Sequence, residues 1–389
     1  MRDLNLSGKR LLIREDFNVP VQDTKVSHTA RIQAALPTIQ WALAQGATVI
    51  LVSHLGRPVE GRISPEDSLE PVRAVLSSLL NLPVALLSLE ALENSIHTQS
   101  LMPGSVTLLE NVRCLVGEAE NSPELGKRLG ALCDIFVMDA FAVAHRAQAS
   151  TVSVAVYAPV ACAGPLLIAE LEAVERILAS PQRPVMAIVG GAKVSTKLAL
   201  LNHLLDRVDT LILGGGIANT FLRAQGYAIG DSLFEPALVP LAQDLLAKAQ
   251  KQHKLIWLPQ DVVVADNLSA TAHPTIKSVS AVHGSDKIFD IGPQAQAELG
   301  DLLQTAQIIL WNGPLGVFEY PAFSAGTQAL AQAIAKSRAF SVAGGGDTLA
   351  AVAQYHVTDQ ISYLSTGGGA FLEALEGKIL PAVAVLTRE

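Results

Sequence analysis

Residues 185–213 read VMAIVGGAKVSTKLALLNHLLDRVDTLIL, and this stretch decides the fold class. It opens on five apolar residues followed by two glycines, and it closes on a second apolar run, Thr210–Leu213. Between them, apolar side chains recur at helical spacing from Leu198 to Val208. A short strand, a helix and a second strand in this order are typical of a parallel sheet covered by helices.

The same alternation extends outward through both halves of the chain. In the first half we expect strands at Arg10–Arg14, Thr48–Ser53, Val106–Leu109 and Ile135–Met138. In the second half we expect them at Val185–Val189, Thr210–Leu213, Leu255–Leu258, Ile308–Trp311, Ser341–Ala343 and Ile361–Leu364. A chain of 389 residues is long enough for two domains of ~100–200 residues each. The sequence therefore predicts an α/β protein whose parallel sheets are covered by helices on both faces.

The boundary between the two halves falls between Pro165 and Pro184. This segment carries apolar residues on one helical face: Leu167, Leu171, Val174 and Leu178. Pro181 and Pro184 are expected to end the helix. A single helix between two domains could act as a rigid spacer, a hinge or both, and the sequence leaves these alternatives open.

Composition limits the classes of function. Half of the residues are hydrophobic and 16% are charged, which excludes a disordered or fibrous chain. Lys and Arg number 28 against 36 for Asp and Glu, so the net charge is −8. Such a surface does not attract nucleic acid or an anionic membrane, so any anion must bind to a local basic cluster.

The longest uncharged stretch, Ala147–Ala169, would be long enough to span a membrane. Pro159, Gly164 and Pro165 interrupt it, so we interpret it as a buried strand and a connection. The N-terminus is polar and shows no signal peptide. The three cysteines are far apart and form no C-x-x-C: Cys114, Cys133 and Cys162. We therefore expect a cytoplasmic protein with free thiols.

Arginines and histidines follow the strands of the first half, where ligands bind in open α/β sheets. The strand ends lead into Asp16–Pro20, Ser53–Pro58, Glu110–Arg113 and Ala144–Arg146. With Arg31, which follows the first of these loops, four arginines and two histidines gather at one rim: Arg31, Arg57, Arg113, Arg146, His54 and His145. Each arginine alone could pair with a surface carboxylate. Four together repel one another unless anions neutralise them, which predicts a small substrate with more than one negative charge.

Glycines follow the strands of the second half. The clusters are Gly190-Gly191, Gly214-Gly215-Gly216, Gly344-Gly345-Gly346 and Gly367-Gly368-Gly369. One such cluster would indicate only a tight turn, but four that each precede a helix favour a nucleotide-binding surface. No G-x-x-x-x-G-K-S/T or G-x-G-x-x-G motif is present, which argues against a P-loop enzyme and a dinucleotide-binding enzyme.

Four ionisable residues in this half have two interpretations each. Lys193 and Lys197 lie four residues apart at the start of the expected helix, where two positive charges each cost about 0.3–1 kcal/mol. A bound phosphate would reverse that cost, whereas solvated surface lysines would need no ligand. Asp347 could cap the helix that begins near Thr348 or ligate Mg²⁺ beside nucleotide phosphates. Glu319 could bind ribose hydroxyls or be a solvated loop residue.

Seven blocks in this order resemble the phosphoglycerate kinase family almost end to end. They are Asp16–Pro20, Ser53–Pro58, Gly190–Lys197, Gly214–Gly216, Asn312–Glu319, Gly344–Thr348 and Ser365–Ala370. The resemblance implies two Rossmann-like domains, 1–165 for phosphoglycerate and 185–375 for the nucleotide, joined by a hinge helix at 166–184. It also implies that 376–389 packs back on the first domain. The implied reaction is reversible phosphoryl transfer from 1,3-bisphosphoglycerate to MgADP, giving 3-phosphoglycerate and MgATP, in glycolysis or gluconeogenesis.

The resemblance also implies roles for individual residues of a monomeric enzyme that uses Mg²⁺. The phosphoglycerate site would comprise Asp16, Phe17, Asn18, Arg31, His54, Leu55, Gly56, Arg57, Arg113 and Arg146. The nucleotide site would comprise Lys197, Gly214, Asn312, Glu319, Gly345, Gly346, Asp347 and Thr348, with Asp347 meeting the metal. The catalytic group would be Arg31, Lys193, Lys197 and Gly368.

Several positions depart from the usual family pattern around Arg146. The departing residues are Met138, Ala142, Val143, Gln148 and Cys114, together with His28-Thr29-Ala30. Because Arg146 itself is present, we expect altered substrate affinity or loop mobility there and not a loss of activity. Two other functions remain as alternatives: an anion-binding receptor without chemistry and a nicotinamide-dependent dehydrogenase. Nucleotide selectivity distinguishes them, since a receptor ignores ADP and a dehydrogenase prefers NAD.

Overall fold

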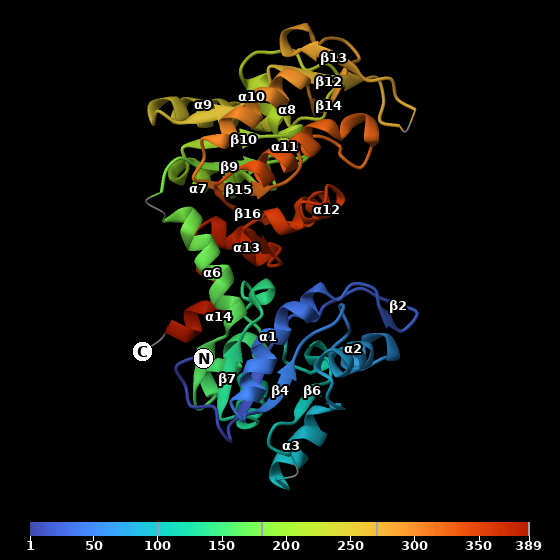
Figure 1. The fold of residues 1–389 in the computed structure, drawn as a ribbon, viewed down its shortest axis with the longest axis vertical. Helices are drawn as coiled ribbons and strands as arrows, with labels where there is room; N and C mark the ends of the chain where they lie inside the picture. Colours follow the sequence, from blue (N-terminus) through green and yellow to red (C-terminus); the bar gives the residue numbers. More distant parts are fainter. Residues whose placement is uncertain (100, 180–181, 270, 388–389) are drawn as a thin grey trace. The chain divides into compact units, whose positions relative to one another are not determined.

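The computed structural model describes residues 1–99, 101–179, 182–269 and 271–387. These residues form two compact units. The first unit comprises Met1–Glu172 and the C-terminal segment from Ile379, and the second comprises Ala173–Lys378. Figure 1 draws α14 (Pro381–Ala384), in red, beside the blue and green elements of the first unit. The amide of Ala382 donates a hydrogen bond to the carbonyl oxygen of Ala144 at 3.1 Å, which ties the C-terminal segment to that unit.

The first unit is built on a six-stranded parallel sheet of order β5-β6-β4-β1-β7-β8. The strands are β1 (Arg10–Arg14), β4 (Thr48–Val52), β5 (Val84–Leu87), β6 (Val106–Leu109), β7 (Ile135–Met138) and β8 (Ala161–Ala163). The helices are α1 (Ala30–Ala44), α2 (Glu70–Leu80), α3 (Leu89–His97), α4 (Pro123–Ala131) and α5 (Val154–Tyr157). Every residue of β4 is buried, as expected for a strand covered on both faces.

The second unit repeats this architecture with the order β11-β10-β9-β15-β16-β17, again parallel. The strands are β9 (Val185–Val189), β10 (Thr210–Leu213), β11 (Leu255–Trp257), β15 (Ile308–Asn312), β16 (Phe340–Gly344) and β17 (Tyr363–Ser365). The helices are α7 (Leu198–Arg207), α8 (Gly215–Ala224), α9 (Val239–Lys251), α10 (Pro293–Gln304), α11 (Ala325–Lys336), α12 (Gly346–Gln354) and α13 (Gly369–Leu375). The predicted fold class is therefore confirmed.

All ten expected strands exist, with ends that differ by at most two residues. The sequence analysis missed β5, the short hairpin β2 (Val21–Gln22) and β3 (Lys25–Val26), and one complete sheet. That sheet is antiparallel and comprises β12 (Asp261–Ala265), β13 (Thr275–Ser278) and β14 (Lys287–Ile291). Most of β13 is exposed, so it lacks the apolar run by which a buried strand is detected.

The interpretation of Ala147–Ala169 as a strand and a connection was largely wrong. The segment folds into a π-helical turn at Ala149–Ser153, then α5, and only three of its residues form β8. The segment packs closely against α4, because Gly126 and Gly130 of that helix have no side chain. A Cβ at Gly126 would lie 2.4 Å from Ser153, and one at Gly130 would lie 2.9 Å from Tyr157. No helix among the described residues is long and apolar enough to cross a membrane.

Helix α6 (Pro165–Leu178) begins in the first unit and ends in the second. Two of its four predicted apolar positions, Leu167 and Val174, are buried, and the other two are half-buried. The expected stop at Pro181 lies outside the described residues. Pro184 immediately precedes β9, so the chain leaves α6 and enters the central strand of the second sheet within a few residues.

Candidate active site

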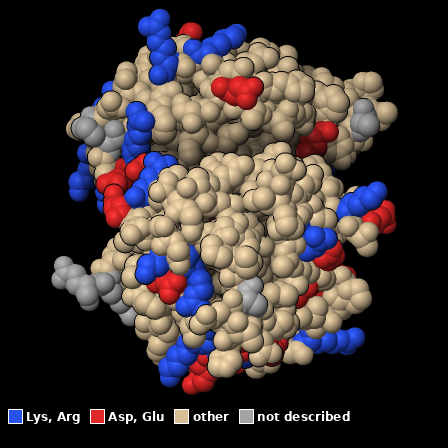
Figure 2. Space-filling view, turned by 60° about the horizontal axis from the view of Figure 1, so that its bottom comes forward, with Lys and Arg blue, Asp and Glu red and all other residues tan. Residues whose placement is uncertain are grey.

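Three arginines of the first unit line one pocket without carboxylate partners. Charged side chains are sparse on the face drawn in Figure 2, and many Lys and Arg there lie beside Asp or Glu. The pocket differs from this pattern. It has a volume of about 260 Å³ and takes Arg57, Arg113 and Arg146 from the loops after β4, β6 and β7. Glu60 and Glu118 also line the pocket, but no described carboxylate oxygen lies within 4 Å of a guanidinium nitrogen of these three arginines. Such a pocket suits an anion that can accept several hydrogen bonds.

The fourth predicted arginine, Arg31, does have a carboxylate partner. Its Nη1 lies 2.8 Å from Oδ2 of Asp16 and donates to the carbonyl oxygen of Asn18 at 2.9 Å. Asn18 in turn accepts the amide of Gly56 on its Oδ1 at 3.0 Å. Asp16, Asn18 and Gly56 therefore hold Arg31 and two loops in fixed positions, and the surface ion-pair interpretation applies to Arg31 but not to the other three arginines.

His54 is buried at the end of β4 beside these arginines. Burial lowers the pKa of its imidazole strongly, and Arg14, Arg113, Arg146 and Arg31 lower it further. The ring is therefore neutral at physiological pH. Its Nδ1 lies 3.9 Å from Oδ1 of Asp16, but a neutral ring makes no ion pair over that distance. Nη2 of Arg14 lies 3.4 Å from Nδ1 of His54 and can only donate to it, so the neutral ring carries its proton on Nε2, where it can donate one hydrogen bond but adds no charge.

A buried network beneath the pocket was not predicted. Nε of Arg14 donates to Oγ of Ser150 at 3.0 Å, and this hydroxyl donates to Glu118 at 2.6 Å. Burial raises the pKa of Glu118, whereas Arg14 and Arg113 lower it. Burial and the neighbouring arginines Arg146 and Arg14 lower the pKa of Arg113 to about 10, so it stays charged at neutral pH. The sequence contains one indication of this network: Arg14 ends the otherwise apolar strand β1, and a buried arginine needs a buried hydrogen-bonding partner.

Two predicted substrate-site residues belong to the core. Phe17 is fully buried, and its amide donates to Oγ of Ser53 at 2.8 Å. Leu55 is 6% exposed, and both its amide and its carbonyl oxygen bond to the side chain of Asn111. These residues shape the loops, whereas the neighbouring Gly56 accepts a hydrogen bond from Arg113 Nη1 at 2.5 Å on its carbonyl oxygen.

The residues that depart from the family pattern occupy different places. Met138, Val143 and Cys114 are buried in the packing behind the pocket. Gln148 lines the pocket itself, is 9% exposed, and is the N-cap of the π-helical turn that begins at Ala149. Of the four departing residues placed here, Gln148 is the one that lines the pocket.

In the second unit, Lys197 is the most constrained of the predicted cations. Its Nζ donates to the carbonyl oxygen of Gly190 at 2.7 Å and to Asn312 at its carbonyl oxygen (3.1 Å) and its Oδ1 (2.7 Å). Burial lowers the pKa of Lys197 to about 8, and Asp347 raises it slightly. Helix α7 begins at Leu198, as expected, and Lys197 is its N-cap residue. Lys193 is exposed in the preceding loop.

The glycine clusters differ in what surrounds them. A Cβ at Gly190 would lie 1.8 Å from the carbonyl oxygen of Pro314, and one at Gly214 would lie 2.8 Å from the backbone of Leu315. These two clusters let the loops after β9, β10 and β15 pack backbone to backbone. In contrast, a Cβ at Gly346 or Gly368 would have no neighbour within 4 Å, so the chain approaches open space there.

The loop before α12 brings further predicted residues together. Nδ2 of Asn312 donates to the carbonyl oxygen of Gly344 at 2.7 Å, and Gly345, with φ of 103°, is the N-cap of the helix. Oγ1 of Thr348 accepts the amide of Gly313 at 2.8 Å. Asn312 thus joins Lys197 to the start of α12, and the exposed Asp347 lies in its first turn. Glu319 is exposed on the loop after β15.

Comparison with known proteins identifies the family of proteins to which this chain belongs. The family model for phosphoglycerate kinase matches residues 1–378. The chain belongs to the phosphoglycerate kinase family. The expected activity is thereby confirmed: it is a phosphotransferase with the glycolytic reaction of that family.

Curated relatives and solved structures agree with this assignment. The chain is 56% identical over 388 residues to phosphoglycerate kinase of Coxiella burnetii, covering 100% of this chain and 98% of that protein. It is 55% identical to the enzyme of Legionella pneumophila strain Corby, covering 99% and 96%. The solved structure of phosphoglycerate kinase from Coxiella burnetii matches with a TM-score of 0.94 at 55% sequence identity, and the match covers 100% of this chain and 97% of that chain. The crystal structure of phosphoglycerate kinase from Pyrococcus horikoshii OT3 matches with a TM-score of 0.82 at 32% sequence identity, and the match covers 99% of this chain and 98% of that chain.

Proposed function

We propose that the first unit binds phosphoglycerate in the basic pocket and that the second unit binds the nucleotide. The observation that carries this division is the set of three arginines, Arg57, Arg113 and Arg146, without a carboxylate partner among the described residues. Phosphoglycerate supplies a phosphate and a carboxylate, which are the groups that arginine forks bind best. Gln148 lines the same pocket, and its side-chain amide would add a hydrogen-bonding group for the substrate.

We place the nucleotide on the loops that follow β9, β10, β15 and β16. The residues assigned to it are Lys197, Gly214, Asn312, Glu319, Gly345, Gly346, Asp347 and Thr348. In the free protein, the ammonium of Lys197 donates hydrogen bonds to the oxygens of Gly190 and Asn312. It can exchange these acceptors for phosphate oxygens without leaving its position. Gly214 contributes through close backbone packing, which leaves the adjoining loop thin enough for a flat base to approach.

Magnesium is proposed to arrive with the nucleotide as part of the substrate. No cluster of three or more His, Cys, Asp and Glu side chains that could hold a metal occurs within the described ranges. One exposed carboxylate, Asp347, fits an ion that takes most of its ligands from phosphates and water, as Mg²⁺ does. Bound in this way, Mg²⁺ would neutralise charge on the phosphate oxygens.

The chemistry follows from positioning and charge. The attacking oxygen in either direction is already anionic, so no general base is needed, and the protein must align the reactants and stabilise the transferred phosphoryl group. We assign this stabilisation to Arg31 and Lys197, with Lys193 and the turn at Gly368 in support. Transfer requires that both substrates meet and that water is excluded, for which α6 would act as the hinge. We further propose that the enzyme is a cytoplasmic monomer.

Isothermal titration calorimetry tests the division between the units. Arg146→Ala should raise the Kd for 3-phosphoglycerate by about 10- to 100-fold, because it removes a charged donor worth about 1.5–3 kcal/mol, and should leave the Kd for MgADP unchanged. Arg128→Ala is the matched control, since Arg128 is an exposed arginine of the same unit that already pairs with Glu93 at 2.8 Å. Unchanged binding of 3-phosphoglycerate to the Arg146 variant would refute the assignment.

A further inference from the structure

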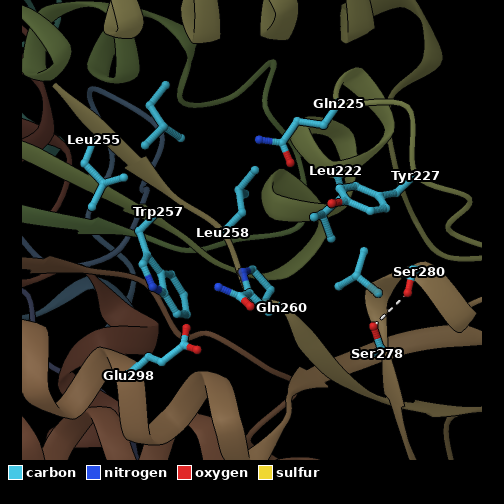
Figure 3. A pocket seen from close by; sticks show the side chains of 13 residues that line it. Leu222, Gln225, Tyr227, Leu255, Trp257, Leu258, Gln260, Ser278, Ser280 and Glu298 are labelled. Carbon is cyan, nitrogen blue, oxygen red and sulfur yellow. Dashed lines mark hydrogen bonds between the residues drawn. The ribbon is translucent and has the colours of Figure 1, made fainter. Parts of the chain in front are cut away.

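A groove of about 430 Å³ in the second unit lies away from all the residues assigned above. It runs along β11 and the loop that follows it (Figure 3). One wall comes from the end of α8 with Leu222, Gln225 and Tyr227, and the opposite wall carries Glu298 of α10. Ser278 and Ser280, whose hydroxyls lie 2.9 Å apart, line it near Gln260. The groove is therefore elongated along a strand and mixed in polarity.

The floor of this groove is the open edge of a sheet. β11 is the last strand of the six-stranded sheet and pairs only with β10 in that sheet. The amide of Leu255 points to β10, where it donates to the carbonyl oxygen of Asp209 at 3.1 Å. Because the direction alternates along a strand, the amide and the carbonyl oxygen of Ile256 point outward. Neither has a hydrogen-bond partner among the residues that the structure describes. Such an edge can pair with a further strand.

The charge of the groove indicates which side chains a bound peptide strand would carry. Glu298 is the one charged side chain in its lining, and Lys, Arg and His are absent from it. Oε1 of Glu298 accepts a hydrogen bond from Gln294 at 3.0 Å, which leaves the carboxylate charge without a cation beside it. Gln225 and Gln260 add amide groups that can bond to a peptide backbone. An anion such as a nucleotide has no partner here, whereas a Lys or Arg side chain does.

We propose that this groove binds an extended peptide segment of a partner protein, which pairs with the edge of β11 and places a Lys or Arg side chain against Glu298. The segment's backbone would use the outward amide and carbonyl oxygen of Ile256. Exposed apolar surface at its rim would cover alternate side chains, since Tyr227 is 41% and Leu255 is 45% exposed. A second copy of this chain is a poorer occupant, because the edge of β11 would bring a second Glu298 and no basic lining residue.

A selection experiment tests the proposal on the full chain. A library of displayed random heptapeptides is selected on the immobilised protein, and binding of each selected peptide is measured by fluorescence. Trp257 lines the groove and is one of three tryptophans in the chain, so Trp257→Phe should abolish the response if binding occurs here. We expect selected peptides to carry Lys or Arg. Their affinity should fall at least tenfold for Glu298→Gln and stay unchanged for Asp301→Asn, an exposed control on the same helix.

Backbone pairing has its own readout. Methylation of single peptide amides should weaken binding at alternate positions, because only every second amide of a strand faces β11. Phosphoryl transfer should be the same in the Glu298 variant as in the unaltered enzyme. Failure to select any peptide, selection of peptides without a basic residue, or the absence of an alternating methylation effect would overturn the proposal. A dimer in sedimentation velocity that Tyr227→Lys dissociates would also overturn it, since the edge would then be occupied by a second copy.

Discussion

The lowered pKa of Lys197 predicts a specific pH dependence of nucleotide use. Burial lowers this pKa to about 8, and the three acceptors on its ammonium are carbonyl oxygens without net charge. Only the charged form can neutralise phosphate oxygens. At pH 7 about nine-tenths of the free enzyme would carry the charge, and at pH 9 about one-tenth. The kcat/KM for MgATP, which reports the free enzyme, should therefore fall about tenfold, or 1.4 kcal/mol, over that range.

The assay is the reverse reaction at saturating 3-phosphoglycerate, with the acyl phosphate consumed by glyceraldehyde-3-phosphate dehydrogenase and NADH followed between pH 6.5 and 9.5. With nucleotide bound, the phosphate charge raises the pKa of Lys197, so the descending limb should move to higher pH in kcat than in kcat/KM. Lys336→Gln is the control, because Lys336 is an exposed lysine of the same unit at the end of α11 and should leave the limb in place.

Variants at Lys197 decide whether this group causes the limb. Lys197→Met should lose turnover by at least ~10²-fold, the scale for one donor to a transition state, and its circular dichroism should stay that of the unaltered protein. MgADP binding to this variant, measured by calorimetry, should no longer weaken between pH 7 and 9. A flat kcat/KM in the unaltered enzyme, or the same pH dependence of MgADP binding in Lys197→Met, would refute the reasoning.

Three further predictions concern other residues. Arg31→Ala should lower kcat by at least ~10²-fold, and near-normal kcat in the same coupled assay would exclude a catalytic role. Glu319→Gln should mainly raise the KM for nucleotide, because the carboxylate is exposed and its expected contact is to ribose; an unaltered KM would remove it from the site. Burial raises the pKa of Asp290 to about 7, so the folded protein holds this proton more tightly than the unfolded chain does. The resulting stability is complete below about pH 4 and is lost as pH rises to 7, by up to about 4 kcal/mol, whereas Asp290→Asn should lack this loss. The measurement is the urea-denaturation midpoint of both proteins at several pH values from 4 to 7. The same change in midpoint with pH in the variant as in the unaltered protein would contradict the prediction.

The sequence predicted those parts of the fold that bury apolar runs. All strands at the centres of the two parallel sheets were predicted, because each is a run of buried aliphatic residues between turn signals. The sheet β12-β13-β14 was missed because most of β13 faces solvent, and β8 could not be located within Ala147–Ala169 because three half-buried residues carry no periodicity. The interpretation of Ala147–Ala169 failed for a related reason, since its apolar residues serve helix packing around glycines of α4.

The candidate site was predictable as a set of residue types but not as a set of contacts. Strand ends identified Arg57, Arg113 and Arg146 as neighbours, since carboxyl ends of parallel strands meet at one edge. The sequence could not show that the buried Glu118 lines the same pocket, because its place there depends on its hydrogen bond to Ser150, 32 residues away. Nor could it show that Lys197, the N-cap residue of α7, bonds with Asn312, which lies 115 residues later. Such contacts depend on the loops that tertiary packing brings together.

The central claim is phosphoryl transfer between phosphoglycerate and a magnesium nucleotide, with one substrate bound by each unit. The most direct test is the coupled assay with 3-phosphoglycerate and MgATP, in which NADH loss is followed while each component is omitted in turn. We predict turnover that requires both substrates and Mg²⁺, with Arg146→Ala raising only the KM for 3-phosphoglycerate. NADH loss that persists without 3-phosphoglycerate, or no turnover from protein that binds both ligands, would contradict the account.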